Sequence, residues 1–294
     1  MHYNGPVVRP PHEANSILLE VTVGCTHNRC RFCTFYRDTR FKVAPLRQVE
    51  EDLKEASFFR PDAKRVFAVG GDPFSLSVSK LKALASLVRQ YLPQANIGTY
   101  ARITSIFRKS VEELRELRSL GFNDLVIGVE SGDDDTLKMA NKGYTSQDIV
   151  RECLKLEAAD INYYVIYLGG LAGRGKGEQN ALRTAHIFNQ LKPSHMYITS
   201  VAILPDSDMY QDVLSGAFRE STELERIKET LTLVRNIKNP IVLYGQSIAN
   251  PVNFIAELPK DRTDLIRMLE DTIGSFTLED ESLLRRHRES LKAV

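Results

Sequence analysis

Apolar runs and amphipathic segments alternate along this 294-residue chain. Runs rich in aliphatic and β-branched residues predict strands. These runs lie at 16–23, 65–69, 96–102, 124–130, 161–168 and 195–204. Apolar residues at helical spacing predict helices between them. These helices lie at 47–59, 78–91, 110–121, 145–158 and 177–191, with further helical stretches near 208 and at 222–236.

The order of these elements predicts the fold class. Nearly continuous apolar strands separated by amphipathic helices are typical of a parallel sheet covered by helices. A full eight-fold barrel takes about 250 residues. Only six predicted strands precede residue 205, and the helical stretches near 208 and at 222–236 complete the sixth strand–helix unit. We therefore expect an α/β fold, a partial TIM-type (β/α)6 barrel with a short C-terminal extension. The expected divisions are an N-terminal extension (1–15), a core barrel (16–207) and a C-terminal helical extension packing on the barrel (208–294).

The apolar stretch at 239–258 is the least regular part of the pattern. It precedes two charged helical segments and repeats neither the length nor the periodicity of the six units. We expect it to close one edge or the bottom of the core.

The amino-acid composition limits the classes of partner that this chain is expected to bind. The chain is 43% hydrophobic and 26% charged, with a formal net charge of +1. This balance is ordinary for a globular protein and gives no overall attraction to nucleic acid or to an anionic membrane. No apolar run approaches the roughly 20 residues of a membrane span, and the N-terminus lacks a signal-like apolar segment. We expect a cytoplasmic protein with no membrane partner and no evident nucleic-acid module.

Unusual residues collect just after the predicted strands. The cysteine loop at 25–33 follows the first strand, 70–73 the second, Arg102 the third, and Glu130 with Ser131 the fourth. Gly169–Gly170 and Pro205 follow the fifth and sixth strands. The carboxyl ends of parallel strands carry the active site in α/β barrels, so these features predict one functional rim.

The loop GCTHNRCRFC (24–33) holds Cys25, Cys30 and Cys33. Thiolates this close together bind a soft metal or an iron–sulfur cluster. Three interpretations compete. A closed zinc site needs a fourth ligand, a [2Fe–2S] site would need Cys153, and a [4Fe–4S] cluster with one open iron needs no further residue. Cys153 lies mid-helix on a core-facing stripe, which favours a small buried side chain.

The same residues resemble the radical S-adenosylmethionine superfamily. The resemblance covers 16–207 and looks closest to the branch of coproporphyrinogen dehydrogenase, the elongator catalytic subunit and the tRNA methylthiotransferases. It implies that Cys25, Cys30 and Cys33 bind a [4Fe–4S] cluster whose fourth iron binds S-adenosyl-L-methionine. Phe32 matches the aromatic residue before the last cysteine. The family's first cysteine gap is usually three residues, and here it is four, which indicates a wider loop.

The resemblance also implies the cofactor-binding residues. Gly70, Gly71 and Asp72 belong to a GGDP turn similar to the family's Gly-Gly-Glu-Pro, which receives the methionine ammonium. The segment IGVESG is similar to an elongator-like pattern that brings Glu130 and Ser131 near the ribose or methionine end. The segment AILPDS resembles the family's Leu-Pro-Gly-Thr segment, which implies that Leu204 lies near the adenine.

Two basic residues are candidates for the methionine carboxylate. Arg102 is the first, with an exposed ion pair as the equally weighted alternative, and Lys142 is a weaker candidate. We interpret the nearby segment Asp133–Asp135 as a solvated helix N-terminus. The tyrosines of the fifth and sixth strands, including Tyr167, read as core residues.

The resemblance implies an oxygen-sensitive radical enzyme. An external one-electron donor of the flavodoxin or ferredoxin type would reduce the cluster. Cleavage of S-adenosylmethionine would then give a 5′-deoxyadenosyl radical that takes hydrogen from a small-molecule, peptide or nucleoside substrate. The sequence does not distinguish an oxidoreductase, a transferase or a lyase. The alternative is a non-catalytic iron–sulfur protein with four cysteines, or a zinc protein, for electron transfer or metal delivery.

Overall fold

The computed structural model describes residues 1–292. It contains two compact units. The first unit comprises Met1–Asn28, Phe35–Gly128 and Glu152–Tyr163. The second unit comprises Arg29–Thr34, Val129–Arg151 and the chain from Tyr164 onward. The cysteine loop is divided between them, with Cys25 in the first unit and Cys30 and Cys33 in the second.

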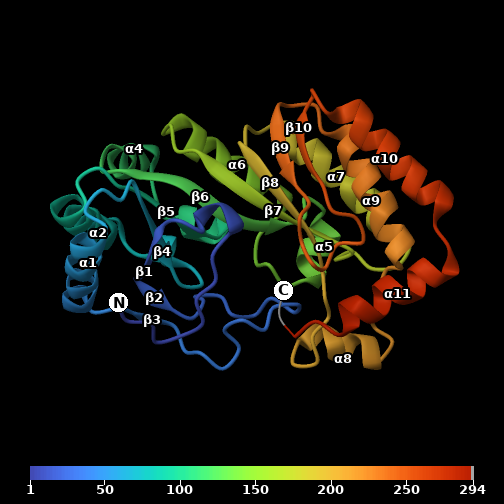
Figure 1. Cartoon of the computed structure of the whole chain (residues 1–294), viewed down its shortest axis with the longest axis horizontal. Helices are drawn as coiled ribbons and strands as arrows, with labels where there is room; N and C mark the ends of the chain where they lie inside the picture. The colour runs from blue at the N-terminus through green and yellow to red at the C-terminus, as the bar shows by residue number, and fades with distance from the viewer. Residues whose placement is uncertain (293–294) are drawn as a thin grey trace. The chain divides into compact units, whose positions relative to one another are not determined.

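The first unit contains parallel strands with helices between them. Its strands are β1 (Ile17–Glu20), β4 (Arg65–Val69), β5 (Asn96–Ala101) and the start of β6 (Phe122–Glu130), which pair in this order and in parallel. A short antiparallel pair, β2 (Thr22–Val23) with β3 (Lys42–Val43), flanks the cysteine loop. The helices are α1 (Leu46–Phe59), α2 (Val78–Tyr91), α3 (Ile103–Ile106) and α4 (Val111–Ser119). Figure 1 shows α1 and α2 side by side.

The second unit continues the same alternation. Its strands are β7 (Tyr163–Gly169), β8 (His195–Ser200), β9 (Ile241–Tyr244) and β10 (Ile255–Leu258). The pairs β7–β8 and β8–β9 are parallel, and β9–β10 is antiparallel. The helices are α5 (Asp134–Met139), α7 (Gly177–Phe188), α8 (Asp208–Leu214), α9 (Glu223–Asn236), α10 (Arg262–Ser275) and α11 (Leu278–Glu289). Helix α7 packs on α9, and α9 on α10 (Figure 1). Helix α6 (Ser146–Ala158) begins in this unit and ends in the first.

The α/β class with parallel strands is confirmed. Burial explains the sequence pattern, since four of the five residues of β4 are buried. Strands covered on both faces need apolar residues at successive positions. The capping hydrogen bonds predicted at two helix starts are also present. Ser110 and Glu113 form a reciprocal capping box at α4, and the hydroxyl of Thr145 accepts from the backbone N–H of Asp148 at the start of α6.

The expected helical extension at 208–294 needs a correction. It contains the strands β9 and β10 as well as four helices in the described residues. Both strands lie in the apolar stretch 239–258, and they extend the edge of the sheet beyond β8. Each has only four residues, so neither is long enough to show a clear period in the sequence. Other short elements, β3, α3 and α5, were not predicted either, for the same reason.

Candidate active site

In the first unit, the end of β4 meets the start of the cysteine loop. The backbone N–H of Gly71 donates to the carbonyl of Gly24 at 3.0 Å. A side chain at Gly71 would place its Cβ 2.6 Å from that oxygen and 2.8 Å from the Cβ of Cys25. At Gly70, where φ is +132°, a Cβ would lie 2.1 Å from the hydroxyl oxygen of Thr22. Both positions therefore require glycine, because only glycine lets the two backbones approach this closely.

Asp72 connects this turn to two other segments. Its carboxylate accepts hydrogen bonds at 2.5 Å from the hydroxyl of Thr26, beside Cys25, and from the hydroxyl of Ser105 in α3. The side chain is buried, and loss of solvation raises its pKa to about 6, although the two hydroxyls and the charges of Arg102 and Lys109 act to lower the pKa. The sequence indicated Asp72 but gave no sign of Ser105, since hydroxyl residues occur at many unrelated positions.

Two basic side chains lie near this carboxylate. Arg102 follows β5 and is 8% exposed, so the alternative of an exposed surface ion pair is wrong. Its backbone N–H donates to the hydroxyl of Ser105 at 3.3 Å. The ammonium of Lys109 donates to the carbonyls of Phe74 and Ser105 at 2.7 and 2.9 Å, and burial lowers its pKa to about 8. The GGDP turn is thus surrounded by buried polar groups.

In the second unit, the rest of the cysteine loop forms a tight turn. The backbone N–H of Cys33 donates to the carbonyl of Cys30 at 3.1 Å. Between them, Phe32 packs against a hydrophobic cluster that includes Leu168 and Met209. The aromatic residue before the last cysteine therefore anchors the turn in the core of this unit.

Glu130 adopts an unusual backbone conformation at the end of β6. Its φ is +69°, a left-handed value that costs a residue with a side chain about 1–3 kcal/mol. The carboxylate accepts from the ammonium of Lys142 at 3.2 Å, and both side chains are buried. The same ammonium lies 5.7 Å from the ring centre of Phe32 and 5.6 Å from that of Tyr144. Lys142, predicted only as a weak candidate, thus joins Glu130 to the cysteine turn.

Ser131 and Asp133 have partners within the protein. The hydroxyl of Ser131 donates to Asn180 at 2.5 Å and accepts from the backbone N–H of Asp133 at 2.9 Å. Asp133 caps α5, as a helix-start aspartate should, but it is buried and paired with Arg183. The expectation of a fully solvated Asp133–Asp135 segment is therefore wrong at its first residue. Asp134 and Asp135 are exposed.

Leu204 lies beyond the end of β8, in a segment without regular structure. Its carbonyl accepts from the backbone N–H of Ser207 at 2.9 Å and from the Ser207 hydroxyl at 2.7 Å. The predicted strand 195–204 therefore ends four residues early, and Leu204 belongs to a turn that leads into α8.

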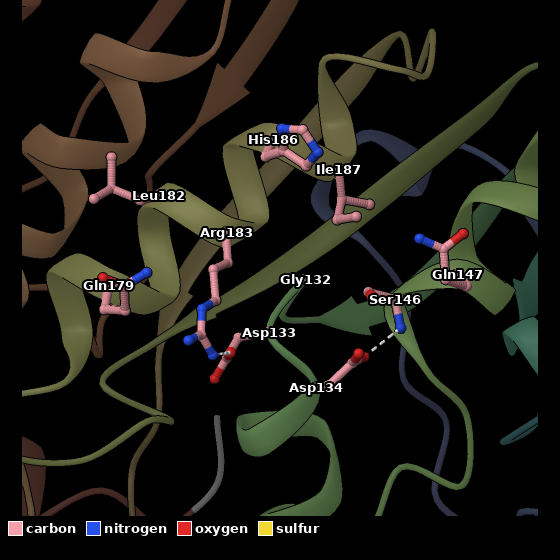
Figure 2. A pocket seen from close by; sticks show the side chains of 10 residues that line it. All are labelled: Gly132, Asp133, Asp134, Ser146, Gln147, Gln179, Leu182, Arg183, His186 and Ile187. Carbon is pink, nitrogen blue, oxygen red and sulfur yellow. Dashed lines mark hydrogen bonds and ion pairs between the residues drawn. The ribbon is translucent and has the colours of Figure 1, made fainter.

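A separate cavity of about 460 Å³ lies beside α7 in the second unit. Figure 2 shows Arg183 reaching toward Asp133, and Asp134 bonded to the start of α6 at Ser146. The predicted cofactor residues do not line it. Its lining residues are Gly132, Asp133, Asp134, Ser146, Gln147, Gln179, Leu182, Arg183, His186 and Ile187.

The cysteines fit an iron–sulfur cluster by their chemistry. Cys25, Cys30 and Cys33 are partly exposed and form no disulfide bond. Cys153 is fully buried, and burial raises the pKa of its thiol above its usual range. Thiolates are the ligands that such clusters take, so the three loop cysteines suit the role and Cys153 does not. Within residues 1–292, no three His, Cys, Asp or Glu side chains are already gathered as a metal site.

Comparison of the sequence with known families identifies the class of protein to which this chain belongs. The pattern of the Radical SAM superfamily matches residues 19–185, more than half of the chain. The chain therefore belongs to the Radical SAM superfamily. This membership confirms the expected cofactors, a [4Fe–4S] cluster and S-adenosyl-L-methionine. Among the described residues, no helix has the length and apolar character needed to cross a bilayer.

Particular relatives give a finer comparison. The heme chaperone HemW of Bacillus subtilis (strain 168) is 26% identical over 201 residues, which are 65% of this chain and 52% of that protein. The chain thus spans about half the length of the curated relatives it matches.

Solved structures show the same fold at low sequence identity. Coproporphyrinogen III oxidase (HemN) of Escherichia coli, a radical SAM enzyme, gives a TM-score of 0.56 at 19% identity, over 75% of this chain and 52% of that chain. Elp3 of Methanocaldococcus infernus gives 0.53 at 13% identity, over 88% and 63%. The resemblance to the coproporphyrinogen and elongator branch is confirmed, as is the partial TIM-type barrel of this family.

Proposed function

We propose that this chain is a radical SAM enzyme in which Cys25, Cys30 and Cys33 hold the [4Fe–4S] cluster. A cluster held by these cysteines would supply the electron for reductive cleavage of S-adenosylmethionine to methionine and a 5′-deoxyadenosyl radical, and the radical would abstract hydrogen from the substrate. The match of residues 19–185 to the superfamily carries the proposal, because it includes all three cysteines. The buried position of Cys153 supports three cysteine ligands over four.

Among the residues of the first unit, we propose that the GGDP turn receives the methionine moiety. Backbone carbonyls and the Asp72 carboxylate would accept from the ammonium, because a buried ammonium must have acceptors. Asp72 has two hydroxyl donors already, and its oxygens retain lone pairs for another donor. The guanidinium of Arg102 would bind the methionine carboxylate.

For the residues of the second unit, the proposed contacts are with the nucleoside. Glu130 would accept from the ribose hydroxyls, a role that carboxylates also play in dinucleotide sites. The hydroxyl of Ser131 is engaged with Asn180, so we propose that Ser131 acts by holding the chain after Glu130. Phe32 would shield the cluster, and the backbone at Leu204 would contact the adenine.

The proposal also includes the divisions of the chain and its partners. Residues 16–207 would form the catalytic core, with 1–15 and 208–294 as extensions packed on it. An external flavodoxin or ferredoxin-type protein would supply the electron. The hydrogen donor would be a small molecule, a peptide or a nucleoside.

Anaerobic reconstitution tests the proposal. The reconstituted chain should hold about four irons and release 5′-deoxyadenosine when dithionite and S-adenosylmethionine are added. Cys33→Ala should abolish both the cluster and the product. Cys153→Ala is the matched control and should keep its iron, because its thiol is remote from solvent and stays neutral. A reduced, cluster-loaded protein that leaves S-adenosylmethionine intact would refute the catalytic reading.

The similarity to heme chaperones favours a second candidate function, a chaperone that binds heme. In that case the cluster would not serve hydrogen abstraction. Adding hemin to the cluster-loaded chain distinguishes the two functions. A tight, saturable heme complex without 5′-deoxyadenosine would support the chaperone, whereas 5′-deoxyadenosine without a heme complex would support the enzyme.

A further inference from the structure

The turn that carries Cys30 and Cys33 rests on helix α8. Arg31 lies inside this turn, and its backbone is held on both sides. Its N–H donates to the carbonyl of Ala140 at 3.1 Å, and its carbonyl accepts from the backbone N–H of Met209 at 2.9 Å. Met209 is in the first turn of α8. The backbone between the two cysteines is therefore tied to α8 and to the end of α5.

The side chain of Arg31 makes a second connection to the same helix. Its guanidinium binds the carboxylate of Asp212 through two nitrogens, with Nε donating to Oδ2 at 2.7 Å. The pair lies 181 positions apart in the sequence. Two parallel bonds fix the orientation of both groups as well as their distance. Asp212 also raises the pKa of Arg31, so the charge on the guanidinium is secure.

Apolar packing supports the same contact. Phe32, the next residue of the turn, packs against a cluster that contains Met209 and Phe218, and Val213 of α8 packs against that cluster too. The backbone N–H of Phe218 donates to the carbonyl of Asp212 at 3.0 Å. Helix α8 and the chain after it therefore supply polar and apolar support to one short turn.

The charges of Arg31 and Asp212 would also affect the reduction potential of a bound cluster. A cation next to two cluster-binding thiolates would favour the reduced, more negative state of a cluster, because net charge near a cluster sets its potential. Asp212 balances that cation while it holds Arg31 in place. The pair is partly shielded from water, with Arg31 36% and Asp212 20% exposed, so solvent weakens its field only in part.

We propose that Asp212 is a positioning residue for the iron–sulfur site, acting through Arg31 on the turn that carries Cys30 and Cys33. This inference rests on the proposed function, because it requires these cysteines to hold the cluster. Asp212 lies outside residues 19–185, the part that matches the superfamily. The segment after residue 185, which includes α8, would therefore also hold the cluster-binding turn in place.

The test uses the full chain, reconstituted anaerobically, and three variants: Asp212→Asn, Arg31→Gln and the double variant. The first measurement is the rate of iron loss to a chelator. Iron loss should be about ten-fold faster in all three variants. This is the lower end of the decrease in metal affinity seen when a residue that supports a metal ligand is removed. The Asp212→Glu variant keeps the carboxylate and should restore part of the retention.

The second measurement is the midpoint potential of the cluster. Asp212→Asn removes a negative charge, so its potential should rise. Arg31→Gln removes a positive charge, so its potential should fall, and the double variant should return near the wild type. A role confined to general stability would weaken all three variants without opposite shifts of the potential.

Glu289→Gln is the matched control. It breaks another ion pair of the second unit, between Arg285 and Glu289 on α11, where both side chains are about half exposed. Its iron loss and potential should equal those of the wild type. If Asp212→Asn does not fold, Arg31→Lys carries the test, because it keeps the charge but loses the two-pronged geometry. Its iron loss should be faster at a nearly unchanged potential.

The outcomes separate the two proposals. A wild-type chain that binds no four-iron cluster would overturn the proposed function. A wild-type chain that holds its cluster, together with an Asp212→Asn variant of equal retention and potential, would overturn the role of Asp212 and leave the function standing.

Discussion

At the scale of the residue, Asp72 shows how a binding group can cost stability. The carboxylate is buried between the hydroxyls of Thr26 and Ser105, and its pKa is raised from 3.8 to about 6. The folded protein therefore holds the proton more tightly than the unfolded chain. Between pH 4 and 6, stability falls as pH rises, and at neutral pH the full cost of the buried charge, about 3 kcal/mol, is present.

We therefore predict that Asp72→Asn stabilises the metal-free protein at pH 7.5 by about 1–3 kcal/mol. The gain should shrink toward zero by pH 4, where Asp72 is protonated in both states. Urea unfolding at several pH values measures the difference. Asp62→Asn, at an exposed position, should show no such pH-dependent gain. The same Asp72 variant should bind S-adenosylmethionine more weakly in the cluster-loaded protein. A destabilisation that grows with pH would contradict the prediction.

At the scale of the element, buried polar groups hold three helices to the end of β7. Glu229 of α9 accepts from the hydroxyl of Tyr167, the amide of Asn180 on α7 and the backbone N–H of Gly170, at 2.5, 2.9 and 2.8 Å. One turn earlier on α9, the buried Arg226 donates to the carbonyl of Gly169 at 3.1 Å. Arg226 pairs with Glu220, and Glu220 and Glu223 both pair with Arg288 of α11.

Glu229→Gln should destabilise the protein by about 1–3 kcal/mol. The carboxylate faces three donors, and an amide nitrogen in its place would meet one of them without an acceptor. The free energy of unfolding in urea measures this loss. Glu270→Gln removes a half-exposed partner of Arg235 and should have little effect, because exposed ion pairs contribute little. Equal losses in the two variants would contradict the argument.

At the scale of the whole molecule, the residues proposed to bind the cluster and S-adenosylmethionine are distributed over both units of the chain. Cys25, the GGDP turn and Arg102 belong to the first unit, and the other two cysteines and Glu130 belong to the second. A ligand that binds the folded chain and not the unfolded chain stabilises the folded state. S-adenosylmethionine should do so only when the cluster provides the iron to which it binds.

We predict that saturating S-adenosylmethionine raises the melting temperature of the oxidised, cluster-loaded chain by several degrees. Ligand at about 100 times its dissociation constant contributes about 2.7 kcal/mol, and each kcal/mol shifts a protein of this size by about 2–4 °C. Anaerobic calorimetry measures the shift. The metal-free chain should show a much smaller one, and an equal shift in both forms would place the binding site away from the cluster.

The prediction of the fold from sequence succeeded where elements are long. Strands such as β4 and helices such as α2 have the predicted bounds, because their periodicity is carried by neighbouring residues. The strands β9 and β10 were not predicted as strands, since four residues carry little periodic signal. The predicted strand at 195–204 ran past Ser200, because the apolar residues that follow it fill the core from a turn.

The sequence alone determined the order of strands and helices, the three clustered thiols and the cofactors that they imply, because these depend on spacing along the chain. Only the tertiary structure brought Thr26 and Ser105 to Asp72, joined Lys142 to Glu130, and set Asp212 against Arg31. Those contacts join residues from 12 to 181 positions apart, and they depend on where packing places each element. The donors and acceptors involved are common residue types, so nothing in the local sequence distinguishes them from solvated ones.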